Sequence, residues 1–396
     1  MSKRDKKRKK KKEEEEEEEE DAGSETLKDS MASPGPISEK EKKSGKAESQ
    51  AKTTKRKFSK TKNETLLSPF TFRRSNDSYS IEKIECTACP VSIDLLGSLE
   101  TVLGSYKTIT VLELTNCNID GNGIEQISRL LEDGCLKDLN LDMNPNPEEN
   151  FYLLCKPAYN LLYLSLKLCR ISDDGIKKIA EKLKFRDPPE NPKLIGLNLS
   201  FNCITRIGCE YLAGMLRTNR SLSSLVLTGN RICDDGATAI IQELSMFSLS
   251  HSEIIDIRRR RFSALCRKKT DTSLDDIGEV EYPLDKESIR SKGSVFCRGN
   301  LQLQHLNFNW NKLTNVTLKR LINCLHYQNY ILLQDRSKGL LHVFLEGNRF
   351  EKENNEDWEE FSNLLQTRRQ TVNLFENFDD INYTVPTEYA SLREIS

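Results

Sequence analysis

The cysteine pair Cys86 and Cys89 has the spacing of half a structural zinc site, in which two thiolates three residues apart bind the same metal ion. A complete site needs four ligands, and no second cysteine pair of this spacing follows. The stretch HSE at residues 251–253 matches part of a zinc-deaminase signature but lacks the proline and cysteine pair that complete it. We therefore expect neither a metal site nor a cofactor.

Other catalytic patterns are also missing from the sequence. It contains no glycine-rich phosphate loop, no metalloprotease helix motif and no local signature from which a catalytic triad can be assembled. The chain is therefore predicted not to be an enzyme. Instead, asparagine and cysteine recur at one position of a longer pattern, where these side chains have a structural use.

The stretch LIGLNLSFNCI, residues 194–204, has leucine or isoleucine at its first, fourth, sixth and eleventh positions and asparagine at its ninth. The same spacing recurs in copies that begin at Ile109, Leu136, Leu161, Leu222, Leu303 and Leu340. The copy at Leu136 is weaker because Pro145 and Pro147 interrupt it. Self-similarity at such a period predicts a stack of structural repeats.

Each copy predicts a short parallel strand whose leucines enter the core before the chain turns sharply. The turn leaves backbone groups without a strand partner, and an asparagine amide can both donate to them and accept from them. Cysteine can replace asparagine as a small, weak donor. Stacked copies therefore predict a structural ladder of Cys117, Asn144, Cys169, Asn202, Asn230, Asn311 and Asn348.

The first five copies begin 25 to 33 residues apart, which leaves room for a helix after each strand. Connecting segments such as DDGIKKIAEKLK, residues 173–184, have apolar residues at helical spacing behind an early glycine. A strand and helix of this length resemble the ribonuclease-inhibitor type of leucine-rich repeat. The resemblance implies an α/β solenoid, curved like a horseshoe, with parallel strands inside and helices outside.

The spacing breaks once, between Leu222 and Leu303. Within this gap, residues 242–269 predict a prolonged helix ending in a basic cluster, and the polar segment at about 268–299 predicts an extruded loop. The order of repeats, arginine-rich helix and polar insertion resembles the family of leucine-rich repeat-containing protein seventy-one, which has no assigned catalytic activity. This resemblance implies a ciliary or axonemal location.

Composition divides the chain into three parts. Residues 1–78 form a charged arm in which a basic block at 3–12 directly precedes an acidic block at 13–21, and the low apolar content predicts disorder. The repeat domain is predicted to span residues 79–376, with capping helices at 91–104 and 357–369. Residues 377–396 are predicted to be a C-terminal tail.

The whole-chain composition limits location and partners. Hydrophobic residues make up 36%, charged residues 31%, and the formal net charge is -1. No apolar run approaches the roughly 18 residues of a membrane span, and the twelve scattered cysteines suit reduced thiols. We therefore expect a cytoplasmic protein without a membrane association.

Residues between the core leucines are predicted to face the concave side of the solenoid, because strand side chains alternate with a period of two. This predicted surface consists of Glu113, Asp138, Asn140, Asp142, Tyr163, Ser165, Lys167, Asn198, Val226, His305, Asn307, Asn309, His342 and Phe344. It is polar and only mildly acidic at its N-terminal end, which favours a protein partner over nucleic acid. Phe201 and Trp310 precede ladder asparagines and could be aromatic anchors of the interface, although packing between neighbouring turns explains them as well.

Two alternatives to a protein-binding scaffold follow from the charged arm. The Ran GTPase-activating protein also combines ribonuclease-inhibitor-type repeats with an acidic segment, but there the segment follows the repeats, whereas residues 13–20 precede them here. A nuclear scaffold addressed by the basic blocks at 3–12 and 55–62 is the second alternative.

Overall fold

The computed structural model describes residues 69–74, 80–132, 134–186, 191–270, 282–291, 293–335, 338–350 and 356–382. The chain divides into two units, Met1–Ser59 and Lys60–Ser396, and every described residue belongs to the second. Most of the predicted charged arm and of the C-terminal tail therefore lies outside the described residues.

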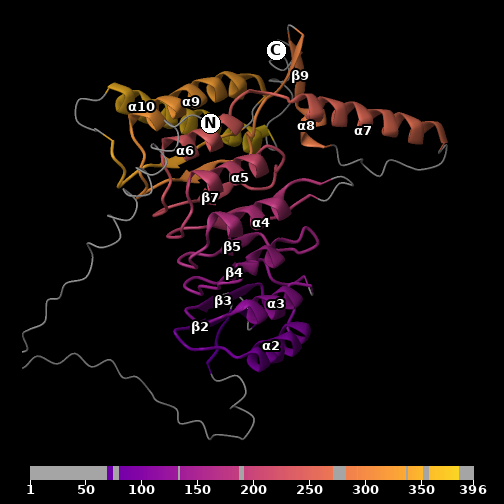
Figure 1. Cartoon of the computed structure of the whole chain (residues 1–396), viewed down its shortest axis with the longest axis vertical. Coiled ribbons are helices and arrows are strands. Elements are labelled where there is room, and N and C mark those ends of the chain that lie inside the picture. The colour runs from indigo at the N-terminus through magenta and orange to yellow at the C-terminus, as the bar shows by residue number, and fades with distance from the viewer. Residues whose placement is uncertain are drawn as a thin grey trace, which may run out of the picture. The chain divides into compact units, whose positions relative to one another are not determined.

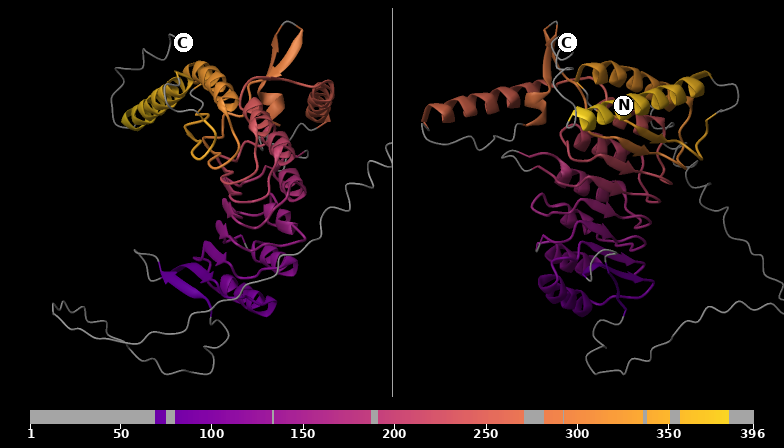
Figure 2. Two further views of the ribbon diagram at one scale, coloured as in Figure 1. Left: turned by 60° about the vertical axis from the view of Figure 1, so that its left-hand side comes forward. Right: turned by 180° about the vertical axis from the view of Figure 1, so that it is seen from behind.

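A nine-stranded sheet lines one side of the second unit, with helices along the other side (Figures 1 and 2). Neighbouring strands from β2 to β12 are parallel and in register, so that Leu139, Leu164 and Leu197 lie side by side. The strands are β1 (Thr71–Arg74), β2 (Ile81–Thr87), β3 (Val111–Thr115), β4 (Asp138–Asn140), β5 (Tyr163–Ser165), β6 (Gly196–Asn198), β7 (Ser224–Val226), β11 (His305–Asn307) and β12 (His342–Phe344). Although distant in sequence, β7 and β11 pair directly, so the insertion leaves the sheet continuous.

Each strand of the repeats is followed by a helix on the outer side of the sheet. These helices are α2 (Ile93–Ser105), α3 (Gly121–Leu130), η1 (Asn150–Cys155), α4 (Asp173–Leu183), α5 (Arg206–Leu216), α6 (Asp234–Glu243), α9 (Asn315–Asp335) and α10 (Glu356–Asn382). All of these are α-helices except η1, which is a short 3-10 helix. It follows Pro145 and Pro147, which cannot donate a backbone hydrogen bond and disfavour helical backbone in the residue before them.

Helix starts are tied to the preceding repeat by carboxylates. Asp173 Oδ1 accepts from the Thr205 backbone N–H at 2.8 Å, at the start of α5. Asp234 accepts from the backbone N–H and the hydroxyl of Thr314 at 2.9 and 2.8 Å, and from the Thr317 backbone N–H at 3.2 Å. Each carboxylate lies in the first turn of its own helix and satisfies N–H donors at the start of the helix of the next repeat, α5 for Asp173 and α9 for Asp234.

The core lies between the sheet and the helices. Inward-facing strand leucines such as Leu112 and Leu114 are fully buried, as are helix residues such as Ile124 and Ile127. This core runs continuously through the repeats and ends beneath α10, where Phe361 and Leu365 are buried. The structure confirms the predicted α/β leucine-rich repeat solenoid with parallel strands on one side and helices on the other.

The ladder position forms the predicted hydrogen bonds between repeats. Asn230 Nδ2 donates to the carbonyls of Leu199 and Leu227 at 3.0 Å each, and its Oδ1 accepts from the Ile204 N–H at 3.2 Å. The amides of Asn144, Asn202, Asn311 and Asn348 make equivalent hydrogen bonds. The thiols of Cys117 and Cys169 donate to the carbonyls of Cys86 and Leu141 at 3.4 and 3.2 Å.

An additional repeat precedes the seven found by spacing. In β2 and the turn after it, Ile84, Cys86 and Val91 are buried in the same core, and β2 pairs in parallel register with β3. Cys89 therefore stands at the ladder position, and the Cys86 thiol is a core group whose pKa burial raises to about 12. The pair that has the spacing of half a zinc site is thus the core and turn of a repeat.

Three predicted boundaries differ from the structure. Residues 71–74, assigned to the arm, form β1, which pairs antiparallel with β2. The predicted helix over 242–269 is wrong as one element, because α6 ends at Glu243 and the chain then forms β8 (Phe247–Ser248) before α7 (His251–Thr270). At the other end, α10 continues past the predicted cap and domain boundary to Asn382.

The predicted loop over 268–299 is also partly folded. It contains α8 (Pro283–Lys286), β9 (Ser288–Ser291) and β10 (Ser294–Cys297), and β10 pairs with both β8 and β9. A small core of Leu249, Ile257, Leu284 and Cys297 holds these elements to α7. The prediction was wrong because these few apolar residues are scattered through the gap and show no local period.

Candidate protein-binding surface

The outward side chains of the strands lie in rows across the sheet, because neighbouring strands are in register. The first row contains Asp138, Tyr163, His305 and His342, and the second contains Glu113, Asn140, Ser165, Asn198, Val226, Asn307 and Phe344. Asp142, Lys167 and Asn309 each lie two residues beyond the end of their strand. The fourteen residues predicted for the concave surface therefore share one face of the sheet, and their role in binding stays a prediction.

The second row is largely occupied by hydrogen bonds within the protein. Asn198 Nδ2 donates to Ser165 Oγ at 3.0 Å, and Ser165 Oγ donates to Asp142 Oδ1 at 2.5 Å. Further along, the Thr228 hydroxyl donates to Asn307 Oδ1 at 2.8 Å. These polar groups would have to break existing hydrogen bonds to bind a partner, so they contribute little new binding energy.

The residue before each ladder position has left-handed backbone geometry. The φ angles are +61° at Met143, +58° at Leu168, and +55° at both Phe201 and Trp310. All four side chains are exposed. We call these four residues the edge column, because the turns that carry them border the sheet. Large apolar residues are uncommon in this backbone region, which glycine and asparagine populate more readily.

The two aromatic residues of the edge column pack on glycines of the next repeat. A Cβ atom added to Gly229 would lie 2.4 Å from Phe201 Cδ1, and one added to Gly347 would lie 2.5 Å from Trp310 Cδ2. The rings nevertheless remain 43% and 64% exposed. Packing between neighbouring turns thus fixes the orientation of each ring while a large part of it stays accessible. A role in packing between turns and a role as an interface anchor are therefore compatible.

The N-terminal end of the sheet face is charged. Lys83 Nζ lies 2.7 Å from a carboxylate oxygen of Glu113 and 3.3 Å from one of Glu85. Burial alone would lower the Lys83 pKa, but hydrogen bonds to both carboxylates raise it. Burial and the Glu113 charge raise the pKa of Asp138. The acidic character predicted for this end is therefore partly neutralised by Lys83.

The C-terminal end of the same face is aromatic. The His305 ring centroid lies 5.1 Å from that of Phe344 and 6.1 Å from that of His342. Burial and the neighbouring His342 lower the pKa of His305, which favours its uncharged form. The face therefore changes from ionic at β2 and β3 to aromatic at β11 and β12.

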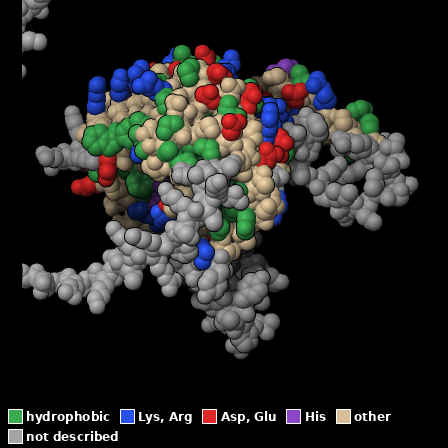
Figure 3. All heavy atoms as spheres, turned by 90° about the horizontal axis from the view of Figure 1, so that it is seen from below, with side chains coloured by type: hydrophobic (Ala, Val, Ile, Leu, Met, Phe, Trp, Pro, Cys, Tyr) green, Lys and Arg blue, Asp and Glu red, His purple; other side chains and the backbone are tan. Residues whose placement is uncertain are grey.

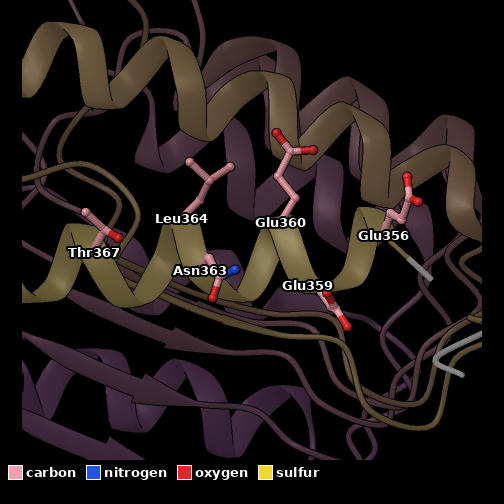
Figure 4. Close-up of a pocket in the computed structure, with 6 residues that line it drawn as sticks. All are labelled: Glu356, Glu359, Glu360, Asn363, Leu364 and Thr367. Carbon is pink, nitrogen blue, oxygen red and sulfur yellow. The ribbon is translucent and has the colours of Figure 1, made fainter. Parts of the chain in front are cut away.

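Two of the hollows in the described part of the chain lie away from the sheet face. One, of about 400 Å³, is lined only by residues of α10, and Figure 4 shows Glu360 and Leu364 pointing to one side of that helix and Asn363 to the other. The other, of about 590 Å³, lies between α6 and α9 and includes Arg217, whose guanidinium already binds Glu243 at 2.9 Å. Among the described residues, no group of three or more His, Cys, Asp and Glu side chains is placed to hold a metal ion.

Comparison with known proteins agrees with the repeat geometry. The family described as Leucine Rich repeat matches residues 107–128, 160–180, 190–213 and 218–240, four segments that each contain a strand of the sheet and residues of the following helix. The chain is a leucine-rich repeat protein. A solved internalin from Listeria monocytogenes aligns with a TM-score of 0.31 and 16% identity over 66% of this chain and 54% of that one.

Curated relatives are similar to part of this leucine-rich repeat protein. The mouse NACHT, LRR and PYD domains-containing protein 4E is 32% identical over 162 residues, which are 40% of this chain and 16% of that protein. The mouse NACHT, LRR and PYD domains-containing protein 14 is 25% identical over 54% of this chain and 22% of its own length. The zebrafish (Danio rerio) Tonsoku-like protein is 23% identical over 62% of this chain and 14% of its own length. The chain thus spans less than a quarter of the length of these relatives.

Sequence reasoning missed part of the candidate surface. Met143 and Leu168 occupy the same repeat position as Phe201 and Trp310, yet only the aromatic pair stood out by residue type. The shared position before a ladder residue was the signal that could have identified all four.

In the described part of the chain, no helix is long and apolar enough to cross a bilayer.

Proposed function

We propose that this protein is a non-enzymatic scaffold that binds a protein partner on the concave face of its solenoid, with the edge column as the anchor. The observation that carries the proposal is Trp310, which combines left-handed backbone, a ring held on Gly347 and 64% exposure. A large exposed aromatic side chain in strained backbone costs stability, of the order of 1–3 kcal/mol. Such a cost is understandable where the ring is an interface anchor.

The edge column suits this role better than the polar second row. Its apolar side chains are exposed, whereas Asn198 and Asn307 already hold neighbouring groups by hydrogen bonds. Lys167 Nζ lies 5.5 Å from the Phe201 ring centroid. A carboxylate of the partner that approaches this ring would therefore also meet the Lys167 ammonium group. The expected partner is a protein that inserts apolar side chains between the edge column and the aromatic end of the sheet.

Proximity labelling with the full chain in ciliated cells tests the binding surface. Phe201→Ala with Trp310→Ala should remove the main labelled partner and leave the melting temperature within a few degrees. Tyr330→Ala is the matched control, because Tyr330 is an aromatic residue of α9 that is also 64% exposed. Unchanged labelling by the double variant would show that the concave edge is not the binding site.

The proposed location is the motile cilium, supported by the resemblance of the repeats, arginine-rich helix and insertion to the family of leucine-rich repeat-containing protein seventy-one. A tagged chain should then localise along axonemes. Nuclear fluorescence that disappears when the lysines and arginines of residues 3–12 are neutralised would favour the nuclear scaffold instead. Accelerated GTP hydrolysis by Ran in the presence of the chain would favour the GTPase-activating alternative.

A further inference from the structure

Helix α7 projects from the solenoid while its base is firmly attached (Figures 1 and 2). At the start of α7, Glu253 binds the Arg217 guanidinium with an N–O distance of 2.5 Å. In its middle, Arg260 binds Asp285 of α8 at 2.7 Å and stacks over the Tyr282 ring at 3.9 Å from the centroid. With Ile257 buried in the small core, the inner side of α7 is already fully used.

The opposite side of α7 exposes large apolar residues. Ile255, Phe262 and Leu265 are 40%, 69% and 61% exposed. Their spacing of seven and three residues places them on one side of a helix with 3.6 residues per turn, away from Ile257. Exposed apolar side chains in such a row, on a helix that is anchored only by its other side, indicate a surface that a partner covers.

The second half of α7 is basic in sequence, and two of its arginines, Arg258 and Arg259, lie on the exposed side. Residues 258–269, RRRRFSALCRKK, contain seven lysines and arginines and no acidic residue. Arg258 and Arg259 are exposed, and they lie between Ile255 and Phe262 on the helix surface. Figure 3 shows hydrophobic and basic side chains together on the part of the molecule that extends to the right, where α7 lies.

We propose that the exposed side of α7 docks into the apolar groove of an acidic protein, in the way that calcium-loaded calmodulin encloses a basic amphipathic helix. The groove would cover Phe262 and Leu265, and carboxylates at its rim would bind Arg258 and would replace Asp256, which lies 3.1 Å from the Arg259 guanidinium, as the partner of Arg259. Charge favours an acidic protein over a second copy of this chain. A second copy of α7 would bring like charges together, which opposes self-association.

The arrangement of cations also favours a protein over a lipid surface. A helix that lies in a membrane buries a broad apolar sector and keeps its cations on the polar side. On α7, Arg258 lies within the apolar sector itself and Arg259 lies at its border, three and four residues after Ile255. A bilayer would have to accept both guanidinium groups beside Phe262, whereas a protein groove can present carboxylates at these positions.

Calorimetric titration of the full chain with calmodulin tests this proposal. In the presence of calcium we expect binding that weakens at least about tenfold in EDTA, because the apolar grooves close without calcium. Phe262→Ala with Leu265→Ala should weaken binding by about tenfold or more, since these are the anchor side chains. Arg258→Glu with Arg259→Glu should weaken it similarly through the loss of charge pairing.

The matched control is Ile207→Ala with Val316→Ala, which removes two exposed apolar side chains from α5 and α9 and should leave calmodulin binding unchanged. Absence of calcium-dependent binding, or equal binding by the Phe262 and Leu265 variant, overturns the proposal. Tighter binding to phosphatidylcholine vesicles containing phosphatidylserine than to calmodulin also overturns it, in favour of a membrane surface.

Discussion

Replacing Asn202 with alanine tests the structural ladder at a position where the consequence can be worked out atom by atom. Its Oδ1 accepts from the Ile171 N–H at 3.0 Å, and its Nδ2 donates to the Leu166 and Leu199 carbonyls at 2.9 and 3.0 Å. The Leu199 carbonyl keeps a second donor, because Asn230 Nδ2 lies 3.0 Å away. The Ser200 carbonyl, which also accepts from Asn202 Nδ2 at 3.3 Å, keeps the Leu168 N–H as a donor at 3.0 Å. The substitution therefore orphans two buried backbone groups, the Ile171 N–H and the Leu166 carbonyl.

An orphaned buried donor or acceptor costs about 1–3 kcal/mol, so Asn202→Ala, which orphans two such groups, should lower the free energy of unfolding by about 2–6 kcal/mol. Asn202→Cys should cost about half as much, about 1–3 kcal/mol, because a thiol can replace the donor. At the ladder position of an earlier repeat, the Cys169 thiol donates to the Leu141 carbonyl at 3.2 Å. Only the Ile171 N–H would then remain unpaired.

Urea unfolding of the full chain, followed by circular dichroism, measures these differences. Hydrogen exchange of the peptide that contains Ile171 should become faster in Asn202→Ala, because its N–H loses the acceptor. Asn191→Ala, at an exposed asparagine before β6, is the control and should leave the midpoint unchanged. The ladder explanation is wrong if Asn202→Ala unfolds at the control midpoint, or if the cysteine variant is no more stable than the alanine variant.

Two further predictions concern contacts between repeats. Burial alone would raise the Asp234 pKa, but hydrogen bonds from Thr317 and Thr314 lower it below the ordinary 3.8. The ionised carboxylate therefore stabilises the fold above pH 3.8, and this stabilisation is lost as the pH falls through the folded-state pKa. The melting temperature of Asp234→Ala should thus lie below wild type near neutral pH and converge with it in acid, and a constant difference across the pH range would refute this. Gly229→Ala should destabilise by about 1–2 kcal/mol, because Gly229 has φ +68° and its new Cβ would meet Phe201. Gly97→Ala, with open space at its Cβ position in α2, should keep or raise the melting temperature, and equal melting temperatures for the two glycine variants would count against this packing.

The repeat architecture could be predicted because its determinants are close together in sequence. Within one copy, such as residues 194–204, the inward leucines and the ladder asparagine all lie within a single strand and turn. Stacking similar units then repeats the same contacts, so that local spacing implies the tertiary neighbour. The first repeat escaped notice because Ile84, Cys86 and Val91 keep this spacing without a leucine, and only pairing of β2 with β3 reveals it.

The candidate site was predicted only in outline. Alternation along each strand determined which residues share the concave face, since side-chain direction follows from the period of two. Sequence could not show that Asn198 and Ser165 hydrogen-bond each other, because they come from different repeats. That the ring of Trp310 rests on a glycine of the next repeat likewise depends on how the two turns stack.

By itself, the sequence determined the solenoid, its ladder and the face presented by each strand, because each depends on spacing within one repeat. Only the tertiary structure decided how the gap between Leu222 and Leu303 folds. There, β7 pairs directly with β11, while Ile257 and Leu284 meet in a small core beside the sheet. These contacts join residues far apart in the chain without any period, so the chain must fold before they can be recognised.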